Sequence, residues 1–536
     1  MKTKLPGYFH LYLFCYLLMV SACNEKASSY QPVNPADEII YHVFQRSFYD
    51  SNGDGHGDLA GLTGKLDYLQ ELGVTSILML PLYNSVFYHN YFPVDFETID
   101  PEFGTEEDYF KLVREVHRRG MKIYMDMEVQ YVTEDHLWYK DSYLNPSSEY
   151  TGYLIYNGPG NSQPESIVWD LTELLSYDGT IRKVTTLNLK GEKFQTYITG
   201  LFKYWVDPDK DGHFEDGVDG FRIDHMMSDL DWKGKITGLF TDLWKPLFDE
   251  LRKLNPAVQI MGEQANWGAD YGLEYYEEGG LDMVFAFGLN MAIKSFNKRQ
   301  IINKYDSTLL LTPKDKYQVL FIENHDMQRF ASAAGNYPGK MKIGAAFNLL
   351  LKGVPSIYYG QEIGMTGNIG SFGTSDGNHI PIREAFEWYS TIDGPGMALW
   401  YKNSGPWWDQ TNLKDNDGIS LEEQKSDPGS LWNFYHALIK LRKSNTAIRH
   451  GDFRFIENDN DQVITFLRMD KNQNIMVAVN LSGDIQETTI EQKEFTGHNQ
   501  PEKLLFGTVS HDFPNTENGI LRLELEPYGI RVWLLN

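Results

Sequence analysis

Cysteine and basic charge are the scarcest features of this chain. Only two cysteines occur in 536 residues, Cys15 and Cys23. We expect Cys15 to lie in a segment that is removed, so the mature protein can have no internal disulfide and must be stabilised by its core or by metal. Basic side chains number 48 against 74 acidic ones, for a net charge of −26. That charge repels a phosphate backbone, and no Lys/Arg cluster with interleaved aromatics offsets it, which excludes nucleic acid as a partner.

The apolar stretch near the N-terminus is too short to span a bilayer. It runs from Tyr8 to Val20, follows two lysines and ends in VSAC at residues 20–23. This pattern resembles a bacterial lipobox and predicts a signal peptide at residues 1–22, with a diacylated Cys23 as membrane anchor. The expected location is the cell envelope, in the outer membrane of a Gram-negative bacterium. A plain signal peptide followed by a chance cysteine is the alternative.

Internal repeats and low-complexity blocks are also lacking. With 42% hydrophobic and 23% charged residues, the chain can bury a large core. Residues 23–37 are polar and predict a tether. From residue 38, apolar runs of strand length alternate with stretches of helical period, and parallel strands buried on both faces are continuously apolar. The pattern predicts an α/β fold, a (β/α)8 TIM barrel. The eight runs are IIYHVF from Ile39, SILMLP from Ser76, MKIYMD from Met121, DGFRID from Asp219, VQIMGE from Val258, LDMVFAF from Leu281, YQVLFIEN from Tyr317 and PSIYYG from Pro355.

Two further domains are expected around this barrel. Residues 131–195 are rich in Pro, Gly, Ser and Tyr and interrupt the alternation, which predicts a domain inserted after the third strand. The insert divides the barrel into residues 38–130 and 196–448. Short alternating runs with Gly and Asn/Asp turns fill residues 449–536 and predict a C-terminal antiparallel β-sandwich. Within the barrel, Thr105 is expected to cap a helix that stops at Gly120.

Four of the apolar runs lead directly into a carboxylate: Asp126, Asp224, Glu263 and Asp326. Active sites of such barrels lie at the C-terminal ends of the strands, so these side chains are expected to converge on one cleft. A helix N-cap or turn acid is the alternative for any single one of them. Four in succession favour an acidic active site.

Three of these segments, GFRID, MGE and ENHD, resemble signature segments of the α-amylase family of glycoside hydrolases (glycoside hydrolase family 13). The resemblance covers nearly the whole mature chain and extends to bacterial starch-utilisation amylases. It implies that Asp224 is the nucleophile, that Glu263 is the general acid/base, and that Asp326 grips the sugar and stabilises the transition state.

The same resemblance assigns supporting roles. It implies that Arg222 orients Asp224 with Asp126 as its structural partner, and that His325 hydrogen-bonds the reacting sugar. Arg222 lies two residues before Asp224, so both side chains point to the same side of the strand, where the guanidinium can keep Asp224 ionised. Glu263 must instead be held protonated by a drier setting or by neighbouring negative charge.

The chain departs from the family pattern at several positions. The first signature segment reads MDMEVQY, with Gln130 and Tyr131 in place of the usual Asn-His; Tyr131 can still donate a hydrogen bond to substrate. Met227 and Ser228 replace a Lys-His pair expected to line the leaving-group side. The segment YHNYFPVD makes Tyr91 the platform expected to stack under the reacting sugar, with a core tyrosine as the alternative.

A metal motif follows the first strand, in DSNGDGHGD. Oxygen ligands at alternate positions, with glycines that allow a tight wrap, suit Ca²⁺. The resemblance implies the same, because some oligo-α-glucosidase-like members of the family carry a calcium loop here. A solvated acidic turn is the alternative. The expected ligands are Asp50, Asn52, Asp54, the His56 carbonyl and Asp58.

A second run, DPDKDGHFED, repeats part of this spacing. Asp207, Asp209 and Asp211 alternate as in the first motif, but the glutamate that closes an EF-hand is missing. A second metal site and a plain loop both remain open.

These features predict an enzyme that hydrolyses α-1,4 bonds of starch-like glucans or maltooligosaccharides. Retention requires two carboxyl groups about 5 to 5.5 Å apart, so that one bonds covalently to the sugar before water replaces it. An α-1,6-glucosidase, a cyclomaltodextrinase or a transglycosylase of the same family stays open, as does a non-catalytic glycan-binding relative. The partners expected are an α-glucan substrate, the membrane through lipidated Cys23, and a glycan-uptake complex.

Overall fold

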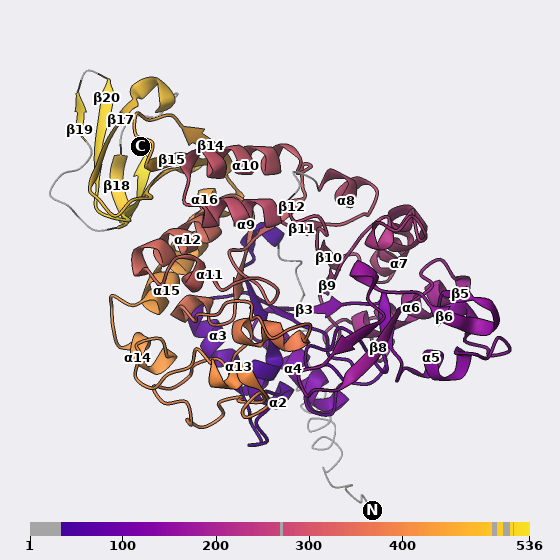
Figure 1. Cartoon of the computed structure of the whole chain (residues 1–536). Coiled ribbons are helices and arrows are strands. Elements are labelled where there is room, and N and C mark those ends of the chain that lie inside the picture. Colours follow the sequence, from indigo (N-terminus) through magenta and orange to yellow (C-terminus); the bar gives the residue numbers. More distant parts are fainter. Residues whose placement is uncertain (1–33, 269–271, 496–500, 508–514, 518, 536) are drawn as a thin grey trace, which may run out of the picture. The chain divides into compact units, whose positions relative to one another are not determined.

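The computed structural model describes residues 34–268, 272–495, 501–507, 515–517 and 519–535 (Figure 1). The expected signal peptide, Cys23 and nearly all of the expected tether lie outside these ranges. Within them, no helix is both long enough and apolar enough to cross a bilayer.

The centre of the fold is a closed barrel of eight parallel strands, which confirms the predicted TIM barrel (Figure 1). Each of the eight apolar runs supplies one strand, and neighbours pair in the order β1-β13-β12-β11-β10-β9-β3-β2. The interior is filled by large apolar side chains from several strands, such as Tyr124, Phe285 and Phe321. The strands are β1 (Ile40–Val43), β2 (Ser76–Met79), β3 (Lys122–Met127), β9 (Gly220–Ile223), β10 (Gln259–Gly262), β11 (Met283–Phe285), β12 (Tyr317–Leu320) and β13 (Val354–Tyr358).

Helices follow the strands and cover the outside of the barrel (Figure 1). As expected, Thr105 caps α4, in a capping box with Asp108, and the helix ends two residues before Gly120. These helices are α2 (Leu59–Gly64), α3 (Leu66–Leu72), α4 (Glu106–Arg118), α6 (Glu192–Val206), α7 (Lys245–Leu254), α8 (Leu273–Glu277), α9 (Phe287–Lys294), α10 (Lys298–Leu310), α11 (Phe330–Ala333), α12 (Pro338–Leu350), α13 (Pro406–Asp409), α14 (Leu421–Lys425), α15 (Leu431–Ser444) and α16 (Thr446–His450).

Strands β9 and β10 approach each other closely at Gly220. A Cβ atom added at this glycine would lie 1.9 Å from the carbonyl oxygen of Gln259. Backbone cannot yield at that distance, so only glycine fits here. The close approach holds together the two strands that lead into Asp224 and Glu263.

The chain between β3 and α6 forms two small antiparallel sheets, within the stretch expected as an insert. One has the strand order β4-β8-β7 and the other pairs β5 with β6. Strand β4 starts at Tyr131, so the insert begins immediately beside the barrel mouth. Its elements are β4 (Tyr131–Thr133), α5 (Leu137–Ser142), β5 (Tyr156–Gly158), β6 (Ser162–Pro164), β7 (Glu173–Leu175) and β8 (Ile181–Thr186).

The C-terminal strands form an antiparallel domain of two sheets, as predicted (Figure 1). A five-stranded sheet, β14-β15-β16-β21-β18, and a three-stranded sheet, β17-β20-β19, share one apolar core that includes Leu467, Leu523 and Trp533. The strands are β14 (Asp452–Ile456), β15 (Val463–Met469), β16 (Asn474–Asn480), β17 (Gln486–Glu491), β18 (Pro501–Phe506), β19 (Asn515–Glu517), β20 (Ile520–Leu525) and β21 (Ile530–Leu535).

A buried glutamate after β13 makes stability depend on pH. Burial raises the pKa of Glu387 from 4.5 to about 9, helped by the negative charge of Asp417. Between those values the unfolded chain has lost a proton that the folded chain keeps. Glu387 therefore lowers the free energy of unfolding as the pH rises, by up to about 1.4 kcal/mol per pH unit.

We expect Glu387→Gln to flatten the fall of the thermal midpoint between pH 5 and pH 9, because glutamine keeps the shape and cannot ionise. Glu107→Gln is the control, since the Glu107 side chain is 76% exposed and, among the described residues, forms its one ion pair with Arg114 at the surface. Thermal scans across this range test the prediction. Parallel profiles for wild type and Glu387→Gln would contradict it.

Candidate active site

The strand register brings the predicted acids together at the C-terminal mouth of the barrel. Asp126 in β3 lies directly opposite Arg222 in β9. Gly262 in β10 lies opposite Ile223, so Asp224 and Glu263 each follow their strands at the same level. Hydrogen bonds from the Asp224 amide to Met127 and from the Glu263 amide to Ile223 continue the ladder, both at 3.0 Å. Strand order thus makes neighbours of residues that are distant in sequence.

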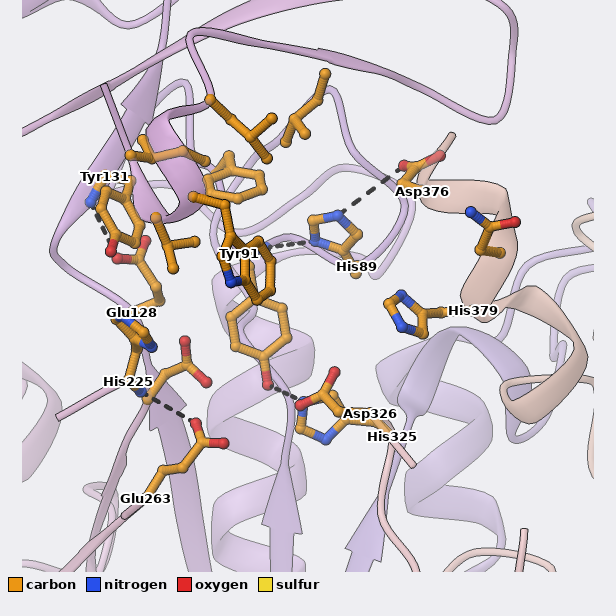
Figure 2. A pocket seen from close by; sticks show the side chains of 18 of the residues that line it. His89, Tyr91, Glu128, Tyr131, His225, Glu263, His325, Asp326, Asp376 and His379 are labelled. Atoms are coloured by element: carbon orange, nitrogen blue, oxygen red, sulfur yellow. Dashed lines mark hydrogen bonds and ion pairs between the residues drawn. The ribbon is translucent and has the colours of Figure 1, made fainter. Parts of the chain in front are cut away.

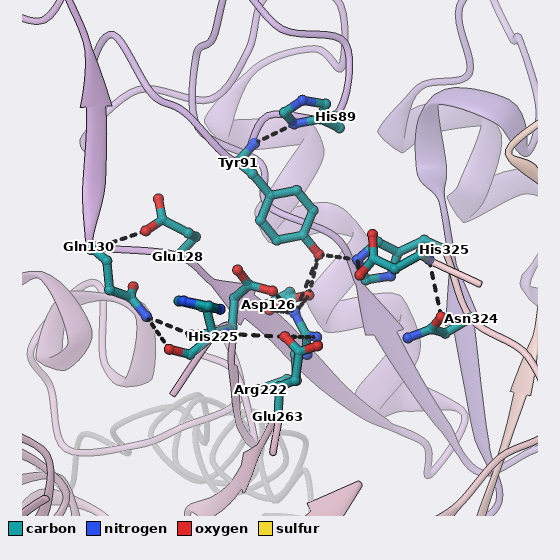
Figure 3. Close-up of polar contacts among 12 residues, drawn as sticks. His89, Tyr91, Asp126, Glu128, Gln130, Arg222, His225, Glu263, Asn324 and His325 are labelled. Carbon is teal, nitrogen blue, oxygen red and sulfur yellow. Dashed lines mark hydrogen bonds and ion pairs between the residues drawn. The ribbon is translucent and has the colours of Figure 1, made fainter. Parts of the chain in front are cut away.

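One guanidinium connects three of the carboxylates (Figure 3). Nη1 of Arg222 donates to Asp126 Oδ2 at 2.7 Å and to Asp224 Oδ1 at 2.5 Å, while Nη2 donates to Glu263 Oε2 at 2.8 Å. Arg222 is 2% exposed, so these bonds form away from water. The planar fork fixes the spacing and orientation of the Asp224 and Glu263 carboxyl groups.

A single positive charge cannot neutralise the acids gathered around it. Burial raises the pKa of Asp224 well above its usual range, against the charge of Arg222, and neighbouring carboxylates add to the rise. Burial likewise raises the pKa of Asp126. The expectation was that Arg222 can keep Asp224 ionised; burial and the neighbouring carboxylates act against that charge. Because these acids interact closely, their titration belongs to the group as a whole.

The pKa of Asp326 is shifted in the opposite direction from those of Asp224 and Asp126. Burial alone would raise its pKa, but the charges of His325 and Arg383 outweigh burial and hold the pKa of Asp326 well below its usual range. Nη2 of Arg383 donates to Asp326 Oδ1 at 2.9 Å, and His325 Nε2 lies 3.0 Å from Asp326 Oδ2. Asp326 is therefore a fixed negative charge beside the acid cluster.

Tyr91 joins the two groups of acids. Its hydroxyl donates to Asp126 Oδ2 at 2.7 Å and lies 2.8 Å from His325 Nε2, and its ring stacks on the His325 ring at 5.3 Å (Figure 3). The backbone amide of Tyr91 donates to His89 Nδ1 at 3.1 Å. With the hydroxyl so engaged, the other face of the ring is what Tyr91 presents to a ligand.

These side chains surround one cavity of about 410 Å³ (Figure 2). Glu263 and Asp326 point into it from different sides, with the Tyr91 ring between them (Figure 2). Arg222 does not line the cavity; it contacts the acids from the barrel interior. Six predicted residues do line it: Asp224, Glu263, Asp326, His325, Tyr91 and Tyr131.

The wall contributed by the insert is apolar. Ile167, Val168, Trp169 and Leu171, from the segment between β6 and β7, line the cavity together with Leu174 of β7. Trp169 is 82% exposed, and its backbone is in the left-handed region at φ 58°. Flat rings and aliphatic side chains opposite a cluster of acids suit a ligand with apolar faces and polar edges, such as a sugar.

The Tyr131 hydroxyl, predicted to donate a hydrogen bond to substrate, contacts the protein itself. Its hydroxyl donates to Asp231 Oδ1 at 2.5 Å, and His225 Nε2 lies 3.0 Å from the same oxygen. The hydroxyl is thus occupied by protein, and Tyr131 presents its ring to the cavity. Gln130 is buried and donates to the Asp224 carbonyl oxygen at 2.6 Å, so it braces the backbone at the predicted nucleophile.

Glu128 is an acid in the cavity wall that the sequence analysis did not select. Its Oε1 accepts the backbone N–H groups of Gln130 and Tyr131 at 2.5 and 3.0 Å. Oε2 is buried and has no hydrogen-bond partner among the residues that the structure describes. Burial raises the pKa of Glu128 well above its usual range, and the residue lines the cavity.

Met227 and Ser228 do not line this cavity. They border a separate one of about 300 Å³, together with Trp232 and Asn266. The chain turns away from the catalytic cavity after His225, whose backbone φ of 43° lies in the left-handed region. The side chain that lines the catalytic cavity directly after Asp224 is therefore His225.

The predicted calcium loop wraps tightly after β1. Asp50 Oδ2 accepts the Gly55 N–H at 2.8 Å, and Asp54 Oδ1 accepts the His56 N–H at 2.8 Å. Gly55 has a φ of 95°, which supplies the sharp turn that an EF-hand-type loop needs at its sixth position. Asp58 also caps α2 through Gly61. Three carboxylates, an amide oxygen and a carbonyl are ligand types that Ca²⁺ prefers. In the described residues, however, Asp50, Asp54 and Asp58 do not each bring a carboxylate oxygen to within 4.8 Å of the other two. The Asp50 and Asp58 carboxylates instead accept backbone N–H groups of the loop itself and of α2.

One carboxylate oxygen each of Asp126 and Asp224 and one ring nitrogen of His325 lie within 4.8 Å of one another, close enough to share a metal ion. The Arg222 guanidinium already binds both carboxylates, and Tyr91 contacts both Asp126 and His325. A positively charged side chain thus takes the place that a metal ion would need.

Several other residues in or next to the cavity carried no signal in the sequence. Arg383 follows the last barrel strand in an irregular segment, so it does not sit at a strand end. Asp231 does not line the cavity but contacts Tyr131 and His225, which do, and it lies in a turn after β9. His225 adjoins Asp224, and Trp267 donates to Glu263 Oε1 at 3.2 Å from four residues further on. Proximity to a predicted acid was the only available clue for these two.

Comparison with known proteins agrees with this architecture. The family model described as "Alpha amylase, catalytic domain" matches residues 42–451, and that described as "Maltogenic Amylase, C-terminal domain" matches residues 453–532. The two matches cover the barrel with its insert and the C-terminal strands, respectively.

Individual relatives span nearly all of the chain. Alpha-amylase 3 of Dictyoglomus thermophilum is 29% identical over 463 residues, covering 83% of this chain and 84% of the relative. The oligo-1,6-glucosidase of Bacillus cereus is 26% identical over 571 residues, covering 93% and 99%. The crystal structure of alpha-amylase from H. orenii superposes with a TM-score of 0.77 at 28% identity, covering 93% of this chain and 99% of that one. The barrel, the acids at its mouth and these matches place the chain in the α-amylase family, as a glycoside hydrolase.

Proposed function

We propose that this chain hydrolyses α-1,4-glucosidic bonds of starch-like glucans or maltooligosaccharides with retention, through a covalent glycosyl-enzyme. The observation that carries the proposal is the Arg222 fork, which binds Asp224 and Glu263 with two nitrogens of one guanidinium. Such a fork suits the separation of about 5 to 5.5 Å that retaining glycosidases need between nucleophile and acid.

In the first step Asp224 attacks the anomeric carbon while Glu263 protonates the departing oxygen. The proton comes from the acid cluster: when it resides on Glu263, Asp224 is ionised and Arg222 neutralises it. In the second step Glu263, now ionised, removes a proton from the water that displaces Asp224 from the sugar. The proton that Glu263 donates leaves with the first product, and the proton taken from water restores Glu263 for the next cycle.

Asp326 is the proposed clamp on the reacting sugar. As an ionised carboxylate fixed by Arg383, it can accept hydrogen bonds from sugar hydroxyls and stabilise positive charge that develops in the ring. Tyr91 would stack under the same ring, and Trp169 would meet a neighbouring sugar. The unpartnered Glu128 Oε2 would form a hydrogen bond with substrate from the cavity wall.

Hydrolysis of α-1,6 bonds is the second candidate, because several relatives carry that activity in their names. They include the glucan 1,6-alpha-glucosidase of Streptococcus pneumoniae, 29% identical over 512 residues, and the oligo-1,6-glucosidase of Bacillus cereus. The test is to incubate the purified protein with starch, maltoheptaose, cyclodextrin, pullulan, dextran, isomaltose and sucrose and to resolve the products. Turnover of maltoheptaose and starch supports the first candidate, and turnover of isomaltose and dextran instead supports the second. Sucrose and larger glycosylated products distinguish transglycosylation.

We further propose that the loop from Asp50 to Asp58 binds Ca²⁺ as a structural ion. Its removal should loosen the segment that follows β1, since the same loop caps α2 through Asp58. We expect EGTA to lower the thermal midpoint of wild type by several degrees more than that of Asp50→Asn, which has already lost a ligand. Asp67→Asn, at an 85% exposed side chain of α3, is the control. Equal losses in wild type and Asp50→Asn would contradict this site.

The location proposed from the sequence is the cell envelope, with the enzyme anchored by lipid on Cys23 and serving a glycan-uptake complex. Support comes from the VSAC sequence at residues 20–23 alone. Incorporation of a labelled fatty acid into wild type but not into Cys23→Ala tests the anchor.

A further inference from the structure

The loop between α6 and β9 gathers carboxylates without a role in the proposed chemistry. One oxygen each from Asp207, Asp209 and Asp216 lies within 4.8 Å of the other two. Asp207 directly follows the last residue of α6, and Asp216 lies four residues before β9 begins. Active sites of such barrels lie at the other end of the strands, so these acids belong to a separate site.

The backbone of this loop follows the design of the loop after β1. Asp207 Oδ2 accepts the Gly212 N–H at 3.3 Å, as Asp50 Oδ2 accepts the Gly55 N–H at 2.8 Å. Gly212 and Gly55 both have left-handed backbones, with φ of 79° and 95°. In both loops, the side chains at the third and fifth positions accept the backbone N–H two residues further on. The two loops therefore share the same pattern of hydrogen bonds from backbone N–H groups to side-chain oxygens.

Two carboxylate oxygens in the second loop lack a partner. Asp207 is 5% exposed, and within the described residues neither its Oδ1 nor Oδ1 of Asp216 has a hydrogen-bond partner, although both atoms are buried. In the described part of the chain, no lysine, arginine or histidine forms an ion pair with Asp207, Asp209 or Asp216. Converging, buried and unneutralised carboxylates are costly unless a cation balances them.

We propose that this loop binds a divalent cation of the Ca²⁺ class through Asp207, Asp209 and Asp216. The donor set consists of oxygen alone, which suits a hard cation and disfavours zinc. The Asp211 carboxylate and the His213 carbonyl oxygen stand at the fifth and seventh positions of the turn, where EF-hand loops also supply ligands. Asp216 would supply the acidic ligand that closes the loop. In an EF-hand a glutamate has this role, and the sequence DPDKDGHFED lacks it at the expected position.

The bound cation ties the end of α6 to the start of β9. Strand β9 carries Arg222 and leads into Asp224, so the cation stabilises the strand on which the acid cluster is built. Because the loop lies at the opposite end of that strand from the cavity, the site is structural. Its loss changes thermal stability and leaves the reaction rate at low temperature unchanged.

The test counts Ca²⁺ bound by the purified, metal-stripped protein in equilibrium dialysis with ⁴⁵Ca²⁺. We compare wild type, Asp216→Asn, Asp50→Asn and the double variant. Asp216→Asn is expected to bind one Ca²⁺ fewer per chain than wild type, and the double variant one fewer than Asp50→Asn. In EDTA, Asp216→Asn melts at the same temperature as wild type, and added Ca²⁺ raises its midpoint by less.

Glu215→Gln is the matched control, because it removes the same charge from an exposed neighbour in the same loop. It is expected to bind as many Ca²⁺ ions as wild type. Equal stoichiometry in wild type and Asp216→Asn, or an equal loss in Glu215→Gln, overturns the proposal. The Asp50→Asn background keeps this result independent of the loop after β1, and an Asp216→Asn protein that already melts early in EDTA also counts against the site.

Discussion

Asp224→Asn is expected to lose about four orders of magnitude or more in kcat on maltoheptaose, with a melting temperature close to that of wild type. An amide keeps the shape and the contact with Arg222 but cannot form the glycosyl ester. The structure favours a clean result, because Asp224 bonds only to Arg222 through its side chain in the described residues. Initial rates over a range of substrate concentrations measure the loss.

Chemical rescue identifies the role of Asp224 beyond the loss of activity. In Asp224→Gly, azide can enter the vacated space and attack the anomeric carbon, while Glu263 protonates the departing oxygen. The expected product is a β-glucosyl azide, inverted with respect to the α-linked substrate. Asp67→Asn, at an 85% exposed side chain of α3, should keep wild-type activity. Residual turnover of Asp224→Asn above a hundredth of wild type, or an α-configured azide from Asp224→Gly, would exclude Asp224 as nucleophile.

Glu263→Gln is expected to reduce turnover of maltoheptaose by about 10²- to 10⁴-fold, the range for loss of a general acid. The sugar oxygen is a poor leaving group without a proton, whereas fluoride leaves unaided. Formation of the glycosyl-enzyme from α-glucosyl fluoride should therefore be nearly unaffected, and breakdown of that intermediate should become limiting. A burst of fluoride release followed by slow turnover is the measurement.

The same variant can be rescued by azide with the opposite stereochemical outcome. Azide needs no general base, so it attacks the glycosyl-enzyme on Asp224 and gives an α-glucosyl azide, with net retention. Glu277→Gln, an exposed glutamate between β10 and β11, is the matched control and should behave as wild type. Equal losses on maltoheptaose and on glucosyl fluoride would contradict the assignment of Glu263 as the proton donor.

The barrel was predictable because its strands carry their own signal. Strands buried on both faces must be apolar throughout, so each run stood out, and a carboxylate at the end of a run marked the mouth of the barrel. The register that places Asp126 beside Arg222 follows from the closed barrel and needs no further information.

Contacts made by irregular segments could not be predicted. Arg383 lies 57 residues after Asp326, and only the path of the loop after β13 brings them together. Tyr131 was expected to use its hydroxyl on substrate, but a turn after β9 places Asp231 within 2.5 Å of it. The pKa of Asp224 depends on four charges from separate strands, which spacing along the chain does not reveal.

The proposed catalytic acids and the apolar residues on the other wall of the cavity come from different segments of the chain. Each proposed catalytic acid follows a barrel strand, whereas the five apolar residues of the insert that line the cavity belong to no barrel strand. These apolar residues can be substituted one at a time while the acids at the barrel mouth stay in place. Substitutions in this apolar wall can therefore change the preferred linkage or chain length without altering the acids themselves.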